Sequence, residues 1–311
     1  MKPIHILQAL IVVLVWGVNF VVIRWGLNEV PPFLLASLRF ICAFLPAVFF
    51  IRKPNLPWKW LMAYGLLNSF AQFAFLFWAM RVGMPAGLAS VVHQSQVFFT
   101  LVLSVLILQQ RTQLMQWLGL AFAVLGLGLI VYGRGTGLGH MTGVGLMLNL
   151  LGALSWAGGN IVVSAMRKAG HTPDALGLVV WSSVVPIVPF ALLSWWFEHG
   201  VYPQWHEVTW HSVVSVLYLA WVATLLGYAL WSRLLSAYEP NRVAPFSLLV
   251  PVVGLLTAWV VLGEQLNAWQ WWGSLALMLG LAVNLFGARL LEWVRGSSRQ
   301  RFIVYCHLLC C

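Results

Sequence analysis

The sequence has little charge and is especially poor in acids. Only 8% of its 311 residues are charged, with 7 Asp and Glu against 17 Lys and Arg, whereas a soluble domain carries about 25% charged residues. So few polar side chains could not cover a core of this size, which excludes an ordinary soluble enzyme, and the long apolar runs exclude a disordered chain. The cations stand singly between those runs, so we expect no nucleic-acid partner.

The sequence also lacks the catalytic, phosphate-binding and metal-binding motifs of soluble enzymes. The four cysteines lack the spacing of a zinc site or of a disulfide framework. The glycine-rich turn at 133–139 lacks the Lys and Ser or Thr that end a phosphate loop, and neither H-E-x-x-H nor G-x-S-x-G occurs. The histidines between 198 and 212 match no metal-ligand spacing. We therefore expect no metal, no cofactor and no catalytic residue.

Long apolar runs are present instead. Hydrophobic residues make up 61% of the chain and its mean hydropathy is +0.89, and a helix crosses the bilayer with about 20 apolar residues. The breaks between runs contain charges, Pro or Gly, and none has room for an extramembrane domain. The first run has no clear signal-peptide cleavage site, so we expect it to be retained. The ten runs lie at roughly 4–23, 33–51, 60–80, 86–108, 114–132, 143–164, 176–197, 213–235, 244–262 and 269–288.

The positive charges predict the orientation. If the N-terminus is cytoplasmic, thirteen of the seventeen Lys and Arg residues fall in the segments on that side, three fall on the other side, and Arg39 lies within a run. Cytoplasmic loops of membrane proteins carry such an excess. Ten spans return the chain to the side on which it starts. We therefore expect a multi-pass membrane protein with cytoplasmic N- and C-termini.

The chain also repeats itself. Residues 108–133, moved by 154 positions, match 262–287 with eight identities in 26 pairs, among them Gln-Trp-x-Gly, and a shift of 141 places Asn19-Phe-Val-Val on Asn160-Ile-Val-Val. Halves of five helices, an odd number, must have opposite topology, and such inverted repeats bind their ligand near the midplane. We expect an all-α membrane protein with ten transmembrane helices as two inverted five-helix repeats, at 4–140 and 141–290, and a cytoplasmic tail at 291–311.

Glycines recur at a seven-residue period in the fifth and tenth runs. Small residues at helix interfaces in membranes allow the backbones to approach closely. We expect these positions to serve packing rather than binding. They are Gly119, Gly126, Gly133, Gly273, Gly280 and Gly287.

Several motifs make the chain recognisable. The stretches Val15-Trp-Gly-Val-Asn-Phe, Gly83-Met-Pro-Ala-Gly-Leu-Ala-Ser and Arg242-Val-Ala-Pro-Phe-Ser-Leu-Leu-Val-Pro are typical of the EamA branch of the drug/metabolite transporter superfamily. The chain resembles this family over about residues 8–288. Ser69–Phe77, taken with Gly83–Ser90, is similar more narrowly to the bacterial exporter of cysteine and O-acetylserine.

The resemblance implies an exporter of small amino-acid metabolites in the cell inner membrane that works by alternating access, with a small-molecule substrate and the lipid bilayer as partners. A broad-specificity drug or amine exporter of the same fold is an alternative. A less favoured alternative is an intramembrane enzyme, for which His93 alone supplies too little chemistry. Whether the chain forms a homodimer stays open.

Two parts of the chain depart from the family pattern. Gly-Glu usually follows the fourth and ninth helices, but only Gly263-Glu264 is present, and the first half has Gln109-Gln110. The residues at 299–311 match nothing in the family and end in Cys-Cys. We expect a dispensable tail there rather than a prenylation signal.

Ionisable groups within membrane spans are costly and usually functional. All seven acids fall in breaks or at helix ends, so we expect no buried carboxylate that could relay protons. Only Arg39 and His93 remain inside the spans. Arg39 is suited to a substrate carboxylate, since guanidinium pairs with carboxylates at two points. Alternatively, Arg39 reaches outward to the interface or caps backbone carbonyls freed near Pro46.

Polar side chains form stripes on the third, fourth and sixth runs. On the fourth, His93, Gln96 and Thr100 share one helical face. The stripes predict the wall of a cavity that binds a zwitterion, and the alternative is hydrogen bonding between helices. Asn19 and Asn160, which the repeat relates, could also pin the two halves together. The candidate substrate-binding residues are Asn19, Arg39, Asn68, Gln72, His93, Gln94, Gln96, Trp156 and Asn160.

Overall fold

The computed structural model describes residues 1–135, 140–202 and 208–287, so the predicted tail at 291–311 lies outside these ranges. Within them the chain is helical and has no strand. Eight helices in this part are long and apolar enough to cross a membrane, and the shorter apolar helix α2 (Pro32–Val48) accompanies them. A last helical stretch runs over 268–287. The all-α class predicted for the fold is therefore confirmed.

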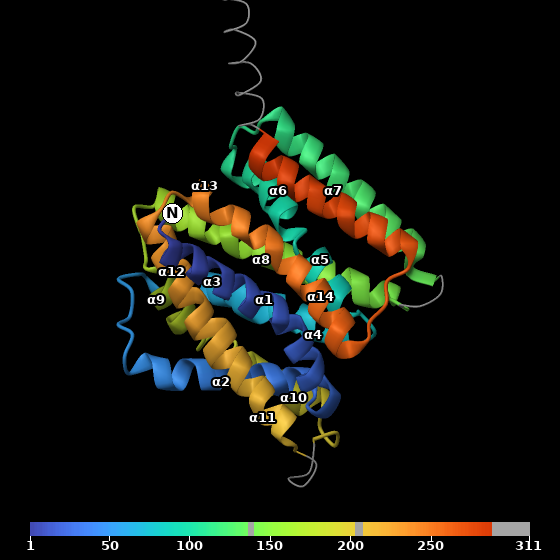
Figure 1. The fold of residues 1–311 in the computed structure, drawn as a ribbon. Helices are drawn as coiled ribbons and strands as arrows, with labels where there is room; N and C mark the ends of the chain where they lie inside the picture. The colour runs from blue at the N-terminus through green and yellow to red at the C-terminus, as the bar shows by residue number, and fades with distance from the viewer. Residues whose placement is uncertain (136–139, 203–207, 288–311) are drawn as a thin grey trace, which may run out of the picture.

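Five of the ten predicted runs contain more than one helical element (Figure 1). Up to residue 135 these are α1 (Pro3–Glu29), α2 (Pro32–Val48), α3 (Trp58–Tyr64), the π-helix η1 (Gly65–Ala71), α4 (Gln72–Arg81), α5 (Ala86–His93), α6 (Gln96–Leu108), α7 (Leu114–Tyr132) and the 3₁₀ turn η2 (Gly133–Gly135). After residue 140 they are α8 (Gly143–Lys168), α9 (Ala175–Ser182), α10 (Ile187–Phe197), α11 (Trp210–Leu217), the π-helix η3 (Tyr218–Leu226), α12 (Gly227–Ala237), α13 (Pro240–Val243), the 3₁₀ turn η4 (Ala244–Leu248) and α14 (Leu249–Leu262).

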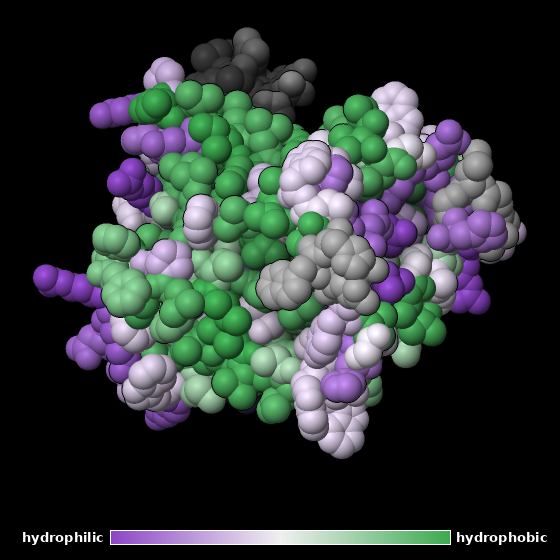
Figure 2. All heavy atoms as spheres, turned by 90° about the horizontal axis from the view of Figure 1, so that it is seen from below, coloured by the Kyte–Doolittle hydropathy of each residue, from purple (hydrophilic) through white to green (hydrophobic). Residues whose placement is uncertain are grey.

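The helices run up and down between two ends of one bundle. We call the end where α1 begins the near end and the end where it finishes the far end. The large residues exposed on the bundle are mostly apolar. Figure 2 shows a broad hydrophobic surface on the face it presents, with hydrophilic side chains gathered toward two opposite edges. Such a surface suits the hydrocarbon core of a bilayer, with polar ends in the headgroup regions.

The first helix is longer than the apolar pattern predicts. We expected a break from Arg24 to Pro32, but α1 continues to Glu29, so this prediction is wrong. Arg24 donates from Nη1 to the carbonyl of Met80 at 2.8 Å, which gives its charge a partner without ending the helix. The helix stops where Pro31 begins, because a proline disfavours helical backbone in the residue before it.

The fourth run is not the continuous helix that we expected. α5 ends at His93 and α6 begins at Gln96, with a tight turn between them. The turn is stabilised by backbone hydrogen bonds between residues three apart, such as the one from Gln94 N to Val91 O at 3.1 Å. The Gln94 side chain donates from Nε2 to the carbonyl of Ser247, in η4, at 3.2 Å. The turn is therefore stabilised from the other half of the chain, a contact that no local pattern could reveal.

The glycine repeats join α7 to the helical stretch over 268–287, which lie side by side in Figure 1. A Cβ atom added at Gly126 would lie 2.6 Å from the carbonyl oxygen of Gly273, and one at Gly119 would lie 2.7 Å from that of Gly280. The two backbones are thus in contact, which only glycine permits at this distance. The predicted packing role of these glycines is confirmed.

Three carboxylates at the far end bind the starts of helices in the other half of the chain. Glu264 accepts from the backbone N–H groups of Ala86 and Gly87 at 2.7 and 2.8 Å. Glu198 accepts from those of Phe33 and Leu34 at 2.7 and 3.0 Å. A helix N-terminus carries partial positive charge and unpaired donors, so a carboxylate is stabilising there.

The third carboxylate of this kind is Glu29. It accepts hydrogen bonds from the hydroxyl of Thr209 at 2.7 Å and from that of Ser212, both at the start of α11. We call Glu29, Glu198 and Glu264 the far-end clasps. Asp174 differs, because it caps its own helix α9 through Gly177 N at 2.8 Å.

Glu198 also corrects the expectation that no carboxylate is buried. Only 4% of this residue is exposed, and Ser194 donates a further bond to it at 2.8 Å. Its position at the end of α10 was predicted, but its burial was not. Burial follows from its role as a cap, because the charge is compensated by three donors rather than by water.

Candidate functional site

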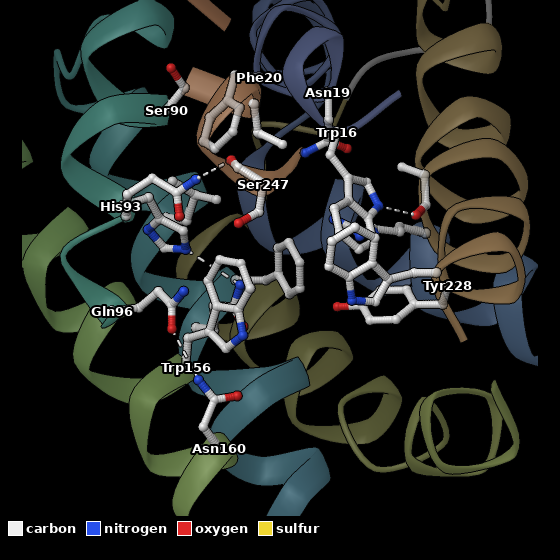
Figure 3. A pocket seen from close by; sticks show the side chains of 18 of the residues that line it. Trp16, Asn19, Phe20, Ser90, His93, Gln96, Trp156, Asn160, Tyr228 and Ser247 are labelled. Atoms are coloured by element: carbon white, nitrogen blue, oxygen red, sulfur yellow. Dashed lines mark hydrogen bonds between the residues drawn. The ribbon is translucent and has the colours of Figure 1, made fainter. Parts of the chain in front are cut away.

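A cavity of about 320 Å³ lies inside the bundle, between helices of both halves (Figure 3). Small-molecule sites occupy roughly 300–1,000 Å³. Tyr64, Asn160 and Trp231 on its wall lie within about two helical turns of the near-end termini of their own helices. The cavity therefore reaches toward the near end, while the clasps lie at the far end.

Arg39 is the charged residue among the described residues of the cavity wall. Its Nη2 donates to the hydroxyl of Thr224 at 3.1 Å, and its Cζ lies 4.0 Å from the centre of the Phe73 ring. Thr224 donates its own proton to Leu219 O at 2.8 Å, so its hydroxyl is fixed as the acceptor. The Nε and Nη1 donors of Arg39 have no hydrogen-bond partner among the described residues.

This placement does not match either structural alternative for Arg39. Only 4% of the residue is exposed, so its side chain does not reach outward to the interface, and its hydrogen bond goes to a hydroxyl rather than to a carbonyl near Pro46. The ring of Phe73 stabilises the cation through its π face. A buried cation with unpaired donors in a cavity can bind an anionic group of a ligand.

His93 belongs to a chain of hydrogen bonds between helices. Asn149 donates from Nδ2 to Ala89 O at 3.2 Å, which leaves its Oδ1 to accept from His93 Nδ1 at 2.8 Å. The other ring nitrogen of His93, Nε2, lies 3.3 Å from Gln72 Nε2 and must therefore accept a proton from it. The neutral imidazole is the form that satisfies both contacts.

A second set of polar side chains, which includes Gln96 and Asn160, lies in the lower part of the cavity wall in Figure 3. Asn160 donates from Nδ2 to Gln96 Oε1 at 3.0 Å and to Thr100 Oγ1 at 3.1 Å. The Trp156 ring lies 5.5 Å from that of His93. The same side chains therefore line the cavity and form hydrogen bonds between helices, and the binding of a zwitterion there stays a prediction.

The predicted residues come together with one exception. Asn19, Arg39, Gln72, His93, Gln94, Gln96, Trp156 and Asn160 line the cavity. Asn68 is buried but lies against Gly159 of α8 and does not line it. Asn68 sits within the π-helix η1, where each turn takes more residues than in an α-helix. The four-residue spacing of Tyr64, Asn68 and Gln72 therefore does not keep their three side chains on one face.

An aromatic side of the cavity was missed by the sequence reasoning. The indole of Trp16 donates to Ala223 O at 3.0 Å, and its ring lies 5.3 Å from those of Tyr228 and Trp231. Ser247 and Val250 complete this side. The three-residue spacing of Tyr228 and Trp231 was a signal, but in a chain with 19 tryptophans it did not stand out.

Comparisons with known proteins identify relatives of the whole chain. The chain is 47% identical over 292 residues to the probable amino-acid metabolite efflux pump of Salmonella typhimurium, covering 93% of this chain and 97% of the relative. It is 44% identical over 293 residues to that of Escherichia coli, with the same coverage. A solved crystal structure with 19% identity shares the fold at a TM-score of 0.63, covering 94% of this chain and 100% of the other.

The family match accounts for almost the whole described part of the chain. Two segments, 3–132 and 143–286, each match the EamA-like transporter family. With its long apolar helices, the chain is a multi-pass membrane protein and a transporter rather than an enzyme. The resemblance seen in the short motifs is therefore confirmed: the chain belongs to the EamA-like transporter family.

Proposed function

We propose that the protein exports small amino-acid metabolites, such as cysteine and O-acetylserine, from the cytoplasm to the periplasm by alternating access. The observation that carries this proposal is Arg39, a buried cation with two unpaired donor nitrogens on the wall of a cavity between the halves. A carboxylate is the common group of these metabolites, and guanidinium is the side chain best suited to it. The names of the Salmonella and Escherichia coli relatives support the same class of cargo.

In the proposed architecture, ten helices span the membrane as two inverted repeats, at 4–140 and 141–290. The two family matches support this division. So do matching irregularities, because π-helices η1 and η3 occur in the third and eighth runs, and tight turns occur at Gln94–Ser95 and in η4 in the fourth and ninth. Alternating access then consists of movement of one repeat against the other around a central site.

In the proposed orientation, the near end faces the cytoplasm. The excess of Lys and Arg in the near-end segments supports this assignment. The cavity reaches toward the near end, and the clasps join the halves at the far end. The structure then corresponds to a state that takes up cargo from the cytoplasm and is closed to the periplasm.

The cavity also separates the proposal from a drug or amine exporter of the same fold. A cationic cargo calls for an acid, but no Asp or Glu occurs among the described residues that line the cavity. Arg39 would instead repel a cation in a medium of low dielectric constant. Cargo with a carboxylate fits the charge of this site.

Transport by the purified protein in proteoliposomes tests the proposal. The wild type should exchange labelled O-acetylserine across the bilayer without chemical change. Arg39→Lys keeps the charge but loses the forked donors, and transport efficiency should fall about tenfold or more, since hydrogen bonds between charged groups are worth about 1.5–3 kcal/mol. Arg81→Lys is the matched control, because Arg81 lies at the far end, where it donates from Nη1 to Leu27 O, and it is not among the described residues of the cavity wall. Equal loss in both variants, or loss of folded protein, would contradict the role of Arg39.

Reporter fusions test the orientation separately. A fusion after Lys168, at the near end, should report the cytoplasm, and one after Tyr202, at the far end, should report the periplasm. The opposite pattern would overturn the proposed direction of transport but leave the binding site intact.

A further inference from the structure

We infer that Gln72 receives the α-ammonium group of the cargo, so that the cavity selects zwitterionic amino acids over carboxylates that lack this group. The inference rests on the proposed function and adds a second recognition point to Arg39. The inference is based on the buried Oε1 atom of Gln72, whose position is determined by the hydrogen bonds around His93.

The network around His93 fixes the side-chain amide of Gln72. Because Asn149 donates to Ala89 O, it must accept from His93 Nδ1, and His93 Nε2 must then accept from Gln72 Nε2. The Gln72 amide cannot turn over without placing its oxygen against the lone pair of the imidazole. Its Oε1 atom is therefore held away from His93.

The Oε1 atom of Gln72 receives no hydrogen bond from the described part of the chain. Gln72 is 5% exposed and lines the cavity, and its Oε1 finds no hydrogen-bond partner among the residues that the structure describes. A buried acceptor without a donor costs free energy, and a ligand that supplies the donor recovers it. The matching group on an amino acid is the ammonium, which carries three donors.

Two further features of the wall suit an ammonium group. Asn19 also lines the cavity, and its Oδ1 is likewise buried and without a partner among the described residues. The Trp156 ring lies beside the His93 ring that Gln72 contacts, at 5.5 Å between centres, and an indole face attracts cations. Neutral oxygens and an aromatic face can hold an ammonium where no acid is present.

Arg39 and Gln72 together would recognise both charged groups of a zwitterion. Among the described residues, Nε and Nη1 of Arg39 have no acceptor, and Oε1 of Gln72 has no donor. A carboxylate without an ammonium satisfies the first and leaves the second unpaired. Sites built to pair a polar group discriminate strongly against analogues that lack it.

The isomers O-acetylserine and N-acetylserine test this inference, because they have the same atoms and the same carboxylate. In N-acetylserine the nitrogen is a neutral amide. Counterflow of each labelled isomer into proteoliposomes is measured under mildly acidic conditions, where the acetyl group does not migrate. The wild type should prefer O-acetylserine by about tenfold or more, as expected for a hydrogen bond to a charged group.

Variants at position 72 provide the decisive comparison. Gln72→Met keeps the length of the side chain and should abolish the preference by slowing O-acetylserine alone. Gln72→Glu restores an oxygen acceptor and should retain or increase the preference. Gln110→Met, at an exposed position outside the cavity, is the control and should leave the preference unchanged.

The outcomes separate the two proposals. An unchanged preference in Gln72→Met, or a preference that falls in Gln72→Glu, overturns the ammonium site. Equal transport of the two isomers by the wild type also overturns it, while the proposed export of amino-acid metabolites stands. A wild type that carries neither isomer overturns the proposed cargo class itself.

Discussion

His93 is a buried histidine whose two ring nitrogens are both occupied by neutral amides. Asn149 accepts from one and Gln72 donates to the other, at 2.8 and 3.3 Å. No Asp or Glu lies on the described part of the cavity wall that could stabilise an imidazolium. The site is therefore built for a neutral ring that positions Gln72, rather than for a proton carrier.

We predict that export by the wild type responds weakly to a pH gradient imposed on proteoliposomes. In His93→Gln the response should stay equally weak, because the ring that is removed carries no proton in transport, while exchange of amino acids slows because Gln72 loses its partner. His5→Gln serves as a control, since His5 contacts Tyr238 at the near end, outside the cavity. A strong response that survives in His93→Gln would place the coupling elsewhere, for example at Glu264 or Glu198.

Single residues of the site differed in how well the sequence revealed them. Arg39 and His93 were identified because an ionisable group inside an apolar run is rare and costly. Trp16 and Tyr228 were missed, since an aromatic residue on a cavity wall has the same pattern as one that faces lipid. Gln72 was identified, but the unpaired state of its oxygen depends on His93 and Ala89 in the fourth run and on Asn149 in the sixth.

The helices themselves were well predicted from apolar runs, while their irregularities were not. The two π-helices lie in the interior of runs that contain no proline at those positions. In η3, Thr224 donates to the carbonyl five residues earlier and presents its oxygen to Arg39. π-Helical turns often occur at functional sites, and here the irregularity is coupled to a tertiary contact that sequence periodicity does not record.

The glycine contacts between α7 and the stretch over 268–287, such as Gly126 with Gly273, form a close-packed seam that substitutions can test. Gly126→Ala would place a methyl group 2.6 Å from Gly273 O, whereas Gly128 has nothing within 4 Å. We expect Gly126→Ala to lower thermal stability in detergent, by about 1–3 kcal/mol for an overpacked contact. Gly128→Ala, two residues away on the same helix, should be neutral or slightly stabilising. Equal melting temperatures for the two variants would contradict a close-packed seam.

Across the whole molecule, the far-end clasps are contacts between halves. Glu29 reaches from the first half to α11, while Glu198 and Glu264 reach from the second half to α2 and α5. Each one joins a carboxylate to the start of a helix. None was predicted, because the sequence shows an acid at a helix end but not which distant helix begins beside it. The family's Gly-Glu turn therefore has a clear structural role in the second half.

We predict that Glu264→Gln opens the far end more often. The amide keeps the size of the side chain but loses the charge that binds Ala86 N and Gly87 N. In a background without the native cysteines, Ser90→Cys on the cavity wall reports access from outside intact cells. Its reaction with a membrane-impermeant maleimide should accelerate roughly tenfold in Glu264→Gln, as expected for the loss of charged hydrogen bonds.

Asp174→Asn provides the control for this experiment, because it removes a carboxylate cap that stays within its own half. Its labelling rate should equal that of the parent. A rate that rises equally in both variants would indicate general loosening of the bundle, and an unchanged rate in Glu264→Gln would show that this clasp does not close the far end.

The single positive charge of the cavity, with no acid among its described lining, has a consequence for the energy source. A zwitterion carries no net charge, so its passage does no work against or with the membrane voltage. An anion leaving a negatively charged cytoplasm would gain about 2.3 kcal/mol per 100 mV. Export of the favoured cargo should thus be indifferent to a potassium diffusion potential, and its steady-state gradient should follow the concentration of the metabolite inside the cell.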